Sequence, residues 1–271
     1  MGNTTLHQLA DYVMCIPPVL ALRKSRARKR FQSADSPHMF YGVYPCFDTA
    51  ADAVPANSHQ GYDIPEAANL YDERTRQVYP ADYPVMLWLT KAFTDGARHV
   101  LDLGGHIGVS YYAYRNFLDY PAELRWTVYD VPAVLARGRR FAEQHDSDAC
   151  LGFCEHLHEV DPVDVLLASG SLQYTREHLV EHIDTLNVRP QWVVLSQLPV
   201  IETATFYTLQ CLGFTYCPYR VQQHAELVEQ MHDAGYRVVD HWDNLEKSLE
   251  LVGYPDLSLD RYRGYCFQRA Q

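Results

Sequence analysis

The architecture of this 271-residue chain depends most on residues 100–110, which read Val100-Leu101-Asp102-Leu103-Gly104-Gly105-His106-Ile107-Gly108-Val109-Ser110. Apolar residues lead into three glycines, and the apolar positions that follow them up to Phe117 recur at helical spacing. We therefore expect a strand, a tight turn and a helix. Glycine lets the backbone turn sharply and approach a ligand closely, because it has no Cβ. The start of the helix then offers free N–H groups to an anion.

The order of the glycines indicates which nucleotide such a turn would bind. A dinucleotide fingerprint that starts at Gly104 needs Gly at position 106 and Gly or Ala at 109, where this chain has His106 and Val109. NAD is therefore disfavoured. The pattern present, Asp-x-Gly-Gly-x-x-Gly, resembles the first motif of class I S-adenosylmethionine-dependent methyltransferases. An acid beside free N–H groups suits a cofactor that carries an ammonium, a sulfonium and a carboxylate. A glycine-rich turn that binds no ligand is the alternative.

Composition narrows the classes of partner. The formal net charge is −11, so the body lacks the basic surface that general nucleic-acid binding requires. The 7 cysteines form no C-x-x-C pair and do not alternate with histidine at zinc-ligand spacing. They predict reduced thiols in a cytoplasmic protein and no metal site. The chain is long enough for one sizeable α/β domain with an appendage.

Residues 1–31 differ from the rest of the chain. An interrupted apolar run precedes six basic residues, which are Arg23, Lys24, Arg26, Arg28, Lys29 and Arg30. A secretory signal peptide has its charges before the apolar run, and Pro17 and Pro18 leave this run too short to cross a bilayer. We expect a basic helix or arm that contacts an assembly partner or lies on an anionic surface, such as a bacterial inner membrane. A plain N-terminal helix and linker is the alternative.

Residues 32–80 combine five prolines with clustered aromatic residues and show little periodicity. Aromatic side chains need burial, so this composition favours irregular packing over a surface rather than disorder. We expect a cap that covers the cofactor or shapes the acceptor pocket. Residues 81–271 then form the main domain.

The main domain alternates strands with helices. After a helix from Ala81 and the first strand, strands are expected at residues 124–129, 151–153, 163–168, 192–195, 236–242 and 262–268, with helices at 132–144, 175–186 and 224–234. This alternation implies a mostly parallel sheet with helices on both faces. The closing helix–strand–strand order matches the methyltransferase variant of the Rossmann sheet, in which the last of seven strands is antiparallel.

Ligands of such sheets bind beyond the carboxyl ends of the strands. Asp130 ends the second strand, at a spacing from Gly104 that suits an acceptor for ribose hydroxyls, although it would also suit a cap for the helix at Pro132. The loop after the fourth strand reads Ser169-Gly170-Ser171-Leu172-Gln173-Tyr174. Its hydroxyl, amide and phenol groups suit a neutral or hydroxylated ligand.

Three patterns together are similar to a family of methyltransferases encoded near bacterial polysaccharide-assembly genes. They are Asp102-Leu-Gly-Gly-x-x-Gly followed by Tyr111-Tyr112 and Arg115-x-Phe-Leu, then Trp126-x-Val-Tyr-Asp130-x-Pro, and then Ser169-Gly-Ser-Leu-Gln-Tyr174. The similarity runs from about Phe40 to the C-terminus. The family often has Glu at position 130, and tends to have Asp-Arg-Thr-Pro where this chain has Ser196-Gln197-Leu198-Pro199. The loss of that charged pair points to a different or less polar acceptor.

The resemblance implies S-adenosylmethionine as cofactor and methyl transfer to a sugar hydroxyl in polysaccharide or O-antigen biosynthesis. The expected cofactor residues are Asp102, Gly104, Gly105, Gly108, Asp130, Ser169 and Gly170. The expected acceptor residues are Gln173, Tyr174, Gln197, Tyr207, Gln210 and Tyr219. The last three belong to an aromatic insertion, residues 206–219, whose ring faces suit a sugar or a sulfonium, or form an ordinary core beneath a lid.

A sugar hydroxyl needs a general base, and His106, His224 and His59 are candidates that no spacing distinguishes. Two other functions stay open. A phenolic type of small-molecule O-methyltransferase is one, because Asp130-Val131-Pro132 resembles the Asp-Leu-Pro of plant-type enzymes. A binding protein that keeps the fold without catalysis is the other.

Overall fold

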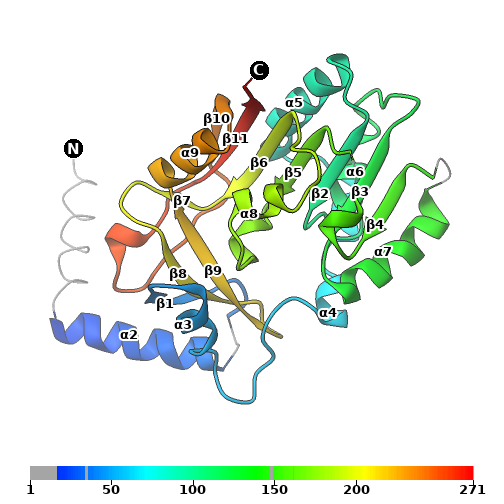
Figure 1. The fold of residues 1–271 in the computed structure, drawn as a ribbon. Coiled ribbons are helices and arrows are strands. Elements are labelled where there is room, and N and C mark those ends of the chain that lie inside the picture. The colour runs from blue at the N-terminus through cyan, green and yellow to red at the C-terminus, as the bar shows by residue number, and fades with distance from the viewer. Residues whose placement is uncertain (1–16, 34–35, 147–148, 161, 271) are drawn as a thin grey trace, which may run out of the picture.

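The computed structural model describes residues 17–33, 36–146, 149–160 and 162–270. The apolar part of the expected N-terminal arm, up to residue 16, lies outside these residues. A seven-stranded sheet forms the centre, with the strand order β10-β11-β6-β5-β2-β3-β4 (Figure 1). Its strands are β2 (His99–Leu103), β3 (Arg125–Tyr129), β4 (Leu151–Cys154), β5 (Val165–Ser169), β6 (Trp192–Leu198), β10 (Tyr236–Asn244) and β11 (Tyr262–Arg269).

The pairing of these strands confirms the expected sheet. The five strands from β2 to β6 pair in parallel, whereas β11 runs antiparallel to both β6 and β10. The last strand of the chain is therefore the antiparallel one, inserted between the fifth and sixth strands of the sheet. This is the methyltransferase variant of the Rossmann sheet.

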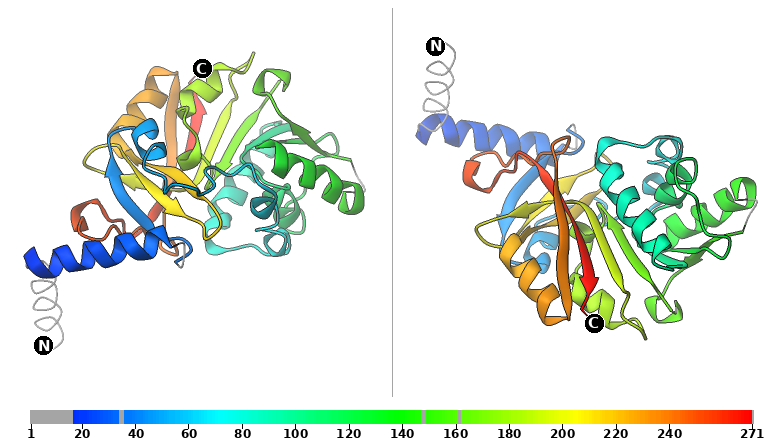
Figure 2. Two further views of the ribbon diagram at one scale, coloured as in Figure 1. Left: turned by 90° about the horizontal axis from the view of Figure 1, so that it is seen from below. Right: turned by 90° about the horizontal axis from the view of Figure 1, so that it is seen from above.

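Helices cover both faces of this sheet (Figures 1 and 2). They are α5 (Tyr83–Thr94), α6 (Val109–Tyr114), α7 (Pro132–His145), α8 (Leu179–Asp184) and α9 (His224–Asp233). Successive strand residues point to opposite faces. Val100 accordingly packs in a buried cluster with residues of α5, α6 and α7, and Leu101 packs in another with residues of α8 and α9. Each central strand is therefore apolar on both faces, as a covered parallel sheet requires.

A second, four-stranded sheet joins the cap to the insertion. Its order is β1-β8-β9-β7, with β1 (Phe40–Tyr44), β8 (Phe206–Cys211), β9 (Tyr216–Gln223) and β7 (Val200–Ile201). β1 pairs antiparallel with β8, so the start of the cap lies against the insertion. Gly42 has a positive φ and the register shifts between Tyr41 and Tyr44, which explains why the sequence shows no two-residue alternation there.

The rest of the cap consists of short helices and loops. These helices are α3 (Phe47–Ala51), α4 (Pro65–Ala68) and two 3-10 turns, Glu73–Arg76 and Pro80–Asp82. In the main domain, α8 begins at Leu179 instead of the expected position 175. The buried guanidinium of Arg220 donates to the carbonyl oxygens of Leu172 at 2.9 Å and Glu177 at 3.1 Å. The Glu177 carbonyl is therefore held in the loop before α8 rather than within the helix.

The basic segment forms helix α2 (Pro17–Gln32), which runs along the edge of the body (Figure 2). Only Ala27 and Phe31 of this helix are buried. The Tyr216 hydroxyl donates to the Phe31 carbonyl at 2.7 Å and so fixes its C-terminal end. Within the described ranges, no helix combines the length and the apolar character needed to cross a bilayer.

Candidate functional site

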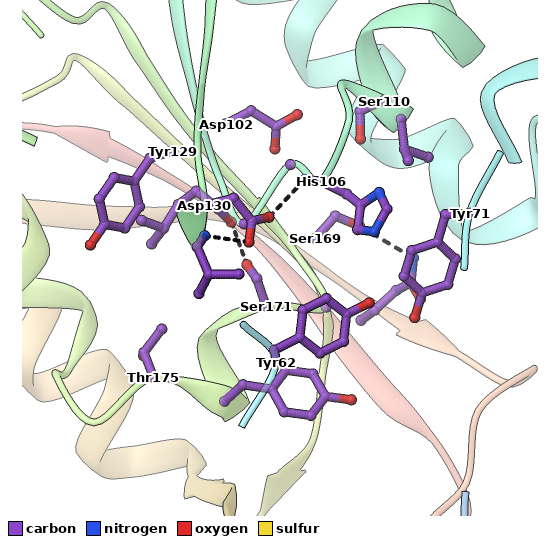
Figure 3. Close-up of a pocket in the computed structure, with 18 of the residues that line it drawn as sticks. Tyr62, Tyr71, Asp102, His106, Ser110, Tyr129, Asp130, Ser169, Ser171 and Thr175 are labelled. Carbon is purple, nitrogen blue, oxygen red and sulfur yellow. Dashed lines mark hydrogen bonds between the residues drawn. The ribbon is translucent and has the colours of Figure 1, made fainter. Parts of the chain in front are cut away.

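A cavity of 730 Å³ lies at the carboxyl ends of the central strands, beneath the cap and the insertion. Its wall includes residues 102–106 at the glycine turn, Tyr129 to Pro132 at the end of β3, and Ser169 to Ser171 at the end of β5. The cap contributes Tyr62 and Tyr71 (Figure 3). The main domain, the cap and the insertion thus meet at one site, at the sheet edge where ligands of this fold class bind.

The glycine turn is shaped by close contacts. A Cβ on Gly105 would lie 2.4 Å from Cγ of Asp102, so only glycine lets this carboxylate turn back against the loop. Gly108 precedes the first residue of α6 with a φ of 90°, a left-handed conformation that favours glycine. Gly104 and Gly105 line the cavity, whereas Gly108 does not. Gly108 therefore shapes the turn from outside the cavity wall.

Asp102 is a buried acid at the carboxyl end of β2, with 1% of its surface exposed. Its Oδ2 accepts a hydrogen bond from Nε1 of Trp126 at 3.1 Å, and this is a neutral donor. Burial raises the pKa of Asp102 to about 7. A cationic group placed beside this carboxyl would favour the ionised form and would itself be bound.

Asp130 follows β3 and is held by two backbone donors. Its Oδ2 accepts the N–H of His106 at 2.9 Å and its Oδ1 accepts the N–H of Val131 at 2.8 Å (Figure 3). Val131, not Asp130, is the cap residue of α7, and no side chain caps that helix. Burial raises the pKa of Asp130 to about 6. Each oxygen keeps a lone pair that can accept a hydroxyl from a ligand.

His106 connects the glycine turn to the cap. Its backbone has a φ of 58°, and its Nε2 lies 3.0 Å from the carbonyl oxygen of Ala67 in α4. Burial lowers the pKa of His106, so the ring is neutral near pH 7 and donates through Nε2. Its ring lies edge-on to that of Tyr71, with centroids 5.0 Å apart. The side chain therefore holds α4 over the turn.

The loop after β5 supplies polar groups to the same cavity. Ser169, Gly170, Tyr174 and Gln197 line it. Nε2 of Gln197 donates to Oγ of Ser169 at 3.2 Å, and the Tyr174 hydroxyl donates to Oε1 of Gln210 at 2.6 Å. The Ser171 hydroxyl donates to the carbonyl of Leu103, so this loop is tied to the strand that carries Asp102.

Four of the expected acceptor residues lie behind the cavity wall. Gln173 and Gln210 are buried, the Tyr219 hydroxyl is hydrogen-bonded to that of Tyr262 at 2.8 Å, and Tyr207 packs against the ring of Phe47. They support the wall and do not line it. Their expected contacts with an acceptor stay predictions.

The three candidate bases are placed differently. Of the three, His106 alone lines the cavity. Nδ1 of His224 lies 2.9 Å from the hydroxyl of Tyr265, outside the cavity wall. His59 is exposed and also lies outside it. In the described part of the chain, no cluster of three or more His, Cys, Asp or Glu side chains could hold a metal ion.

Sequence reasoning did not assign roles to several cavity residues. Tyr62, Tyr71, Arg74 and Lys247 all contribute to the wall. The aromatic content of residues 32–80 indicated a cap but not which tyrosines face inward. Arg74 lies in a single 3-10 turn, and Lys247 lies in a loop far from every motif, so neither belongs to a periodic pattern.

The strand order and the glycine turn define the class of fold, a Rossmann-like methyltransferase sheet. No family model matches the chain, and no curated protein matches its sequence. A solved structure, the 1,6-didemethyltoxoflavin-N1-methyltransferase of Burkholderia thailandensis with 1,6-didemethyltoxoflavin and S-adenosylhomocysteine bound, is 18% identical over 71% of this chain and 79% of its own, with a TM-score of 0.45.

Two further structures show similar values. The magnesium protoporphyrin IX methyltransferase of Synechocystis PCC 6803, with S-adenosylmethionine bound, is 12% identical over 69% of this chain and 77% of its own, with a TM-score of 0.44. An O-methyltransferase family protein from Burkholderia thailandensis is 16% identical over 70% of this chain and 56% of its own, also with a TM-score of 0.44.

Proposed function

We propose that the protein is an S-adenosylmethionine-dependent methyltransferase. The observation that carries the proposal is a pair of carboxylates, the buried Asp102 and the half-buried Asp130, on either side of a glycine turn at the carboxyl ends of paired strands. Neither makes an ion pair with a basic side chain of the described residues. Two desolvated acids without a cation fit a ligand that brings an ammonium group and hydroxyls.

Different residues of the cavity would bind different parts of the cofactor. Asp130 would accept the ribose hydroxyls, and Asp102 would face the ammonium of the methionine part. Gly104, Gly105, Ser169 and Gly170 would complete the wall around it. The cofactor, when bound, supplies an electrophilic methyl group. The chain then has to align an acceptor with that methyl and exclude water, and alignment alone supplies much of the rate of such a transfer.

Calorimetry with S-adenosylhomocysteine tests this proposal. We expect binding by the wild type, weakening by about tenfold or more in Asp102→Asn because a charged partner is lost, and no change in Asp119→Asn. Asp119 is an exposed acid outside the cavity and is the matched control. A wild type that does not bind S-adenosylhomocysteine would contradict the proposal.

For the acceptor we propose a sugar hydroxyl in a nucleotide-linked or lipid-linked glycan. The resemblance to enzymes of polysaccharide assembly supports it, as do the tyrosines of the cavity wall, because aromatic faces pack against sugar rings. Those tyrosines include Tyr62, Tyr71 and Tyr174. A phenolic acceptor would also pack against these rings and is the second candidate.

Transfer of a labelled methyl group separates the candidates. We would offer the full-length protein nucleotide sugars, glycan extracts and phenols in parallel. Incorporation into sugars supports the first acceptor class, and incorporation only into phenols supports the second. Cofactor binding with transfer to none of them favours a binding protein that keeps the fold without catalysis.

We also propose that α2 places the protein on an anionic surface, such as the cytoplasmic face of a membrane. Arg26, Arg28 and Lys29 are exposed on this helix, while the chain as a whole carries a net charge of −11. A basic helix on an acidic body is attracted to anionic lipids through that helix alone.

A further inference from the structure

Two basic side chains in the cavity wall have no carboxylate partner. Arg74 extends from the 3-10 turn Glu73–Arg76 of the cap, and Lys247 extends from the loop after β10. Neither forms an ion pair with any residue that the structure describes. They come from parts of the chain that are distant in sequence, and the fold brings them to one cavity.

The guanidinium of Arg74 is held by aromatic rings. Its central carbon lies 4.6 Å from the ring centroid of Tyr79 and 6.0 Å from that of Tyr71. These contacts orient the plane of the group. Its side-chain N–H groups donate to no acceptor in the described ranges of the chain. An oriented guanidinium with free donors is the group that binds carboxylate and phosphate in a two-pronged manner.

Lys247 interacts electrostatically with Arg74. Burial and the neighbouring charge of Arg74 lower the pKa of Lys247 to about 8, and the opposing effect of Asp82 is smaller. Nζ of Lys247 lies 6.0 Å from the ring centroid of Tyr262. Two like charges in one cavity wall destabilise each other unless an anion lies between them.

Asp82 is not that anion. Its Oδ2 accepts the backbone N–H of Tyr79 at 2.8 Å, and its Oδ1 accepts the hydroxyl of Tyr114 at 2.9 Å. Both carboxylate oxygens are thus turned to neutral donors of the cap and of α6. Arg74 and Lys247 can therefore pair with an anionic group of a bound ligand.

We propose that Arg74 and Lys247 form an anion subsite, which binds a carboxylate or phosphate group of a ligand in this cavity. The inference deepens the proposed function and rests on it for the identity of that ligand. Under that function the anion comes from one of two sources, the methionine carboxylate of the cofactor or an acidic group on the acceptor, such as the diphosphate of a nucleotide-linked sugar. The guanidinium supplies paired donors and the ammonium a point charge.

Binding of inorganic pyrophosphate to the full-length protein tests the subsite directly. We expect wild type to bind it and Arg74→Gln and Lys247→Gln to weaken binding by about tenfold or more, because each variant loses a charged hydrogen bond. Arg76→Gln is the matched control, since Arg76 is exposed on the same 3-10 turn and does not line the cavity. It should bind like wild type.

A second pair of titrations identifies the source of the anion. If the subsite holds the cofactor carboxylate, both variants weaken S-adenosylhomocysteine but leave 5′-methylthioadenosine, which lacks the amino-acid part, unchanged. If it holds an acceptor group, both variants bind S-adenosylhomocysteine like wild type. When they are saturated with S-adenosylhomocysteine, they no longer bind pyrophosphate. Either result supports the subsite.

The proposal is overturned if wild type and both variants have the same affinity for pyrophosphate and also the same affinity for S-adenosylhomocysteine. A wild type that binds pyrophosphate through Arg74 but not S-adenosylhomocysteine refutes the methyltransferase assignment and leaves the subsite standing. Thermal melting checks the fold of each variant. If Arg74→Gln does not fold, Arg74→Lys is measured in its place. This variant keeps the charge and should retain pyrophosphate binding.

Discussion

The carboxylate of Asp130 accepts the backbone N–H of His106 at 2.9 Å, so the end of β3 is tied to the glycine turn that follows β2. His106 in turn holds Ala67 of the cap through its ring. One residue therefore links the acid expected to bind ribose, the turn and the cap. A ligand that contacts Asp130 is therefore connected through His106 to the glycine turn and to the cap.

Ligand affinity should depend on pH through the two acids. The pKa of Asp102 is raised to about 7 and that of Asp130 to about 6, so both are partly protonated in mild acid. We expect the affinity for S-adenosylhomocysteine to rise with pH between 5.5 and 7.5, by at most about tenfold per pH unit for each proton released. Calorimetry across this range measures it. Asp102→Asn should flatten the upper part of the profile, and a profile identical to that of wild type would contradict the role of Asp102.

The stability of the free protein should change in the opposite direction. Both acids have a pKa in the folded protein above the value of about 4 expected in the unfolded chain. The folded state therefore holds protons that the unfolded chain has released, and the free energy of unfolding contributed by these groups falls as pH rises from about 4 to about 7. Urea unfolding at several pH values tests this. Asp102→Asn should unfold with a weaker pH dependence above pH 6.

Gly105→Ala should destabilise the glycine turn by about 1–3 kcal/mol, because the new Cβ would lie 2.4 Å from Cγ of Asp102 and displace it. Gly152→Ala is the control, since a Cβ at Gly152 meets its nearest atom at 3.8 Å. Thermal unfolding and S-adenosylhomocysteine titration report stability and site geometry together. If both variants lost the same amount of stability, the contact with Asp102 would not be the cause of the destabilisation.

His106→Gly should loosen the cap without disturbing the main sheet. Glycine accommodates the φ of 58° but removes the hydrogen bond to Ala67. We expect faster amide exchange in residues 62–72 and unchanged exchange in β2. His59→Ala, which alters an exposed histidine outside the cavity, should leave both unchanged. Unchanged exchange in the cap of His106→Gly would mean that other contacts hold it.

Neutralising three exposed bases of α2 should weaken binding to anionic lipid. The triple variant Arg26→Gln, Arg28→Gln, Lys29→Gln loses charges worth about 1 kcal/mol each near an anionic surface. The control removes three exposed bases elsewhere, Arg125, Arg140 and Arg237. Flotation with phosphatidylserine vesicles compares the two. Equal flotation of both variants and wild type would remove the membrane role.

The sequence predicted the main sheet well because its signals are local. Apolar strands, the glycine turn and the acids that follow β2 and β3 lie within short stretches, and the fold class places such stretches at one edge. Asp102 and Asp130 could therefore be selected as neighbours in space before the structure was known. Their expected roles toward the cofactor stay predictions.

The acceptor side was predicted less completely because its contacts are long-range. The pairing of β1 with β8 depends on residues far apart in the chain, and a bulge hides the alternation of β1. Arg74 and Lys247 meet only when the cap and the loop after β10 fold together. Tyr207 and Gln210 were expected at the acceptor by composition, but composition does not determine which side chains of β8 reach the cavity, and both lie behind the wall.

The pairing of β1 with β8 also orders events during synthesis. Phe40 leaves the ribosome long before its partner Gln210 exists, so the first strand of the cap has no edge to join until most of the protein has been made. The parallel strands from β2 to β6 are complete before that point. The five parallel strands that carry the glycine turn and Asp130 are thus synthesised before β1 has a partner, and the cap joins the insertion only after β8 emerges.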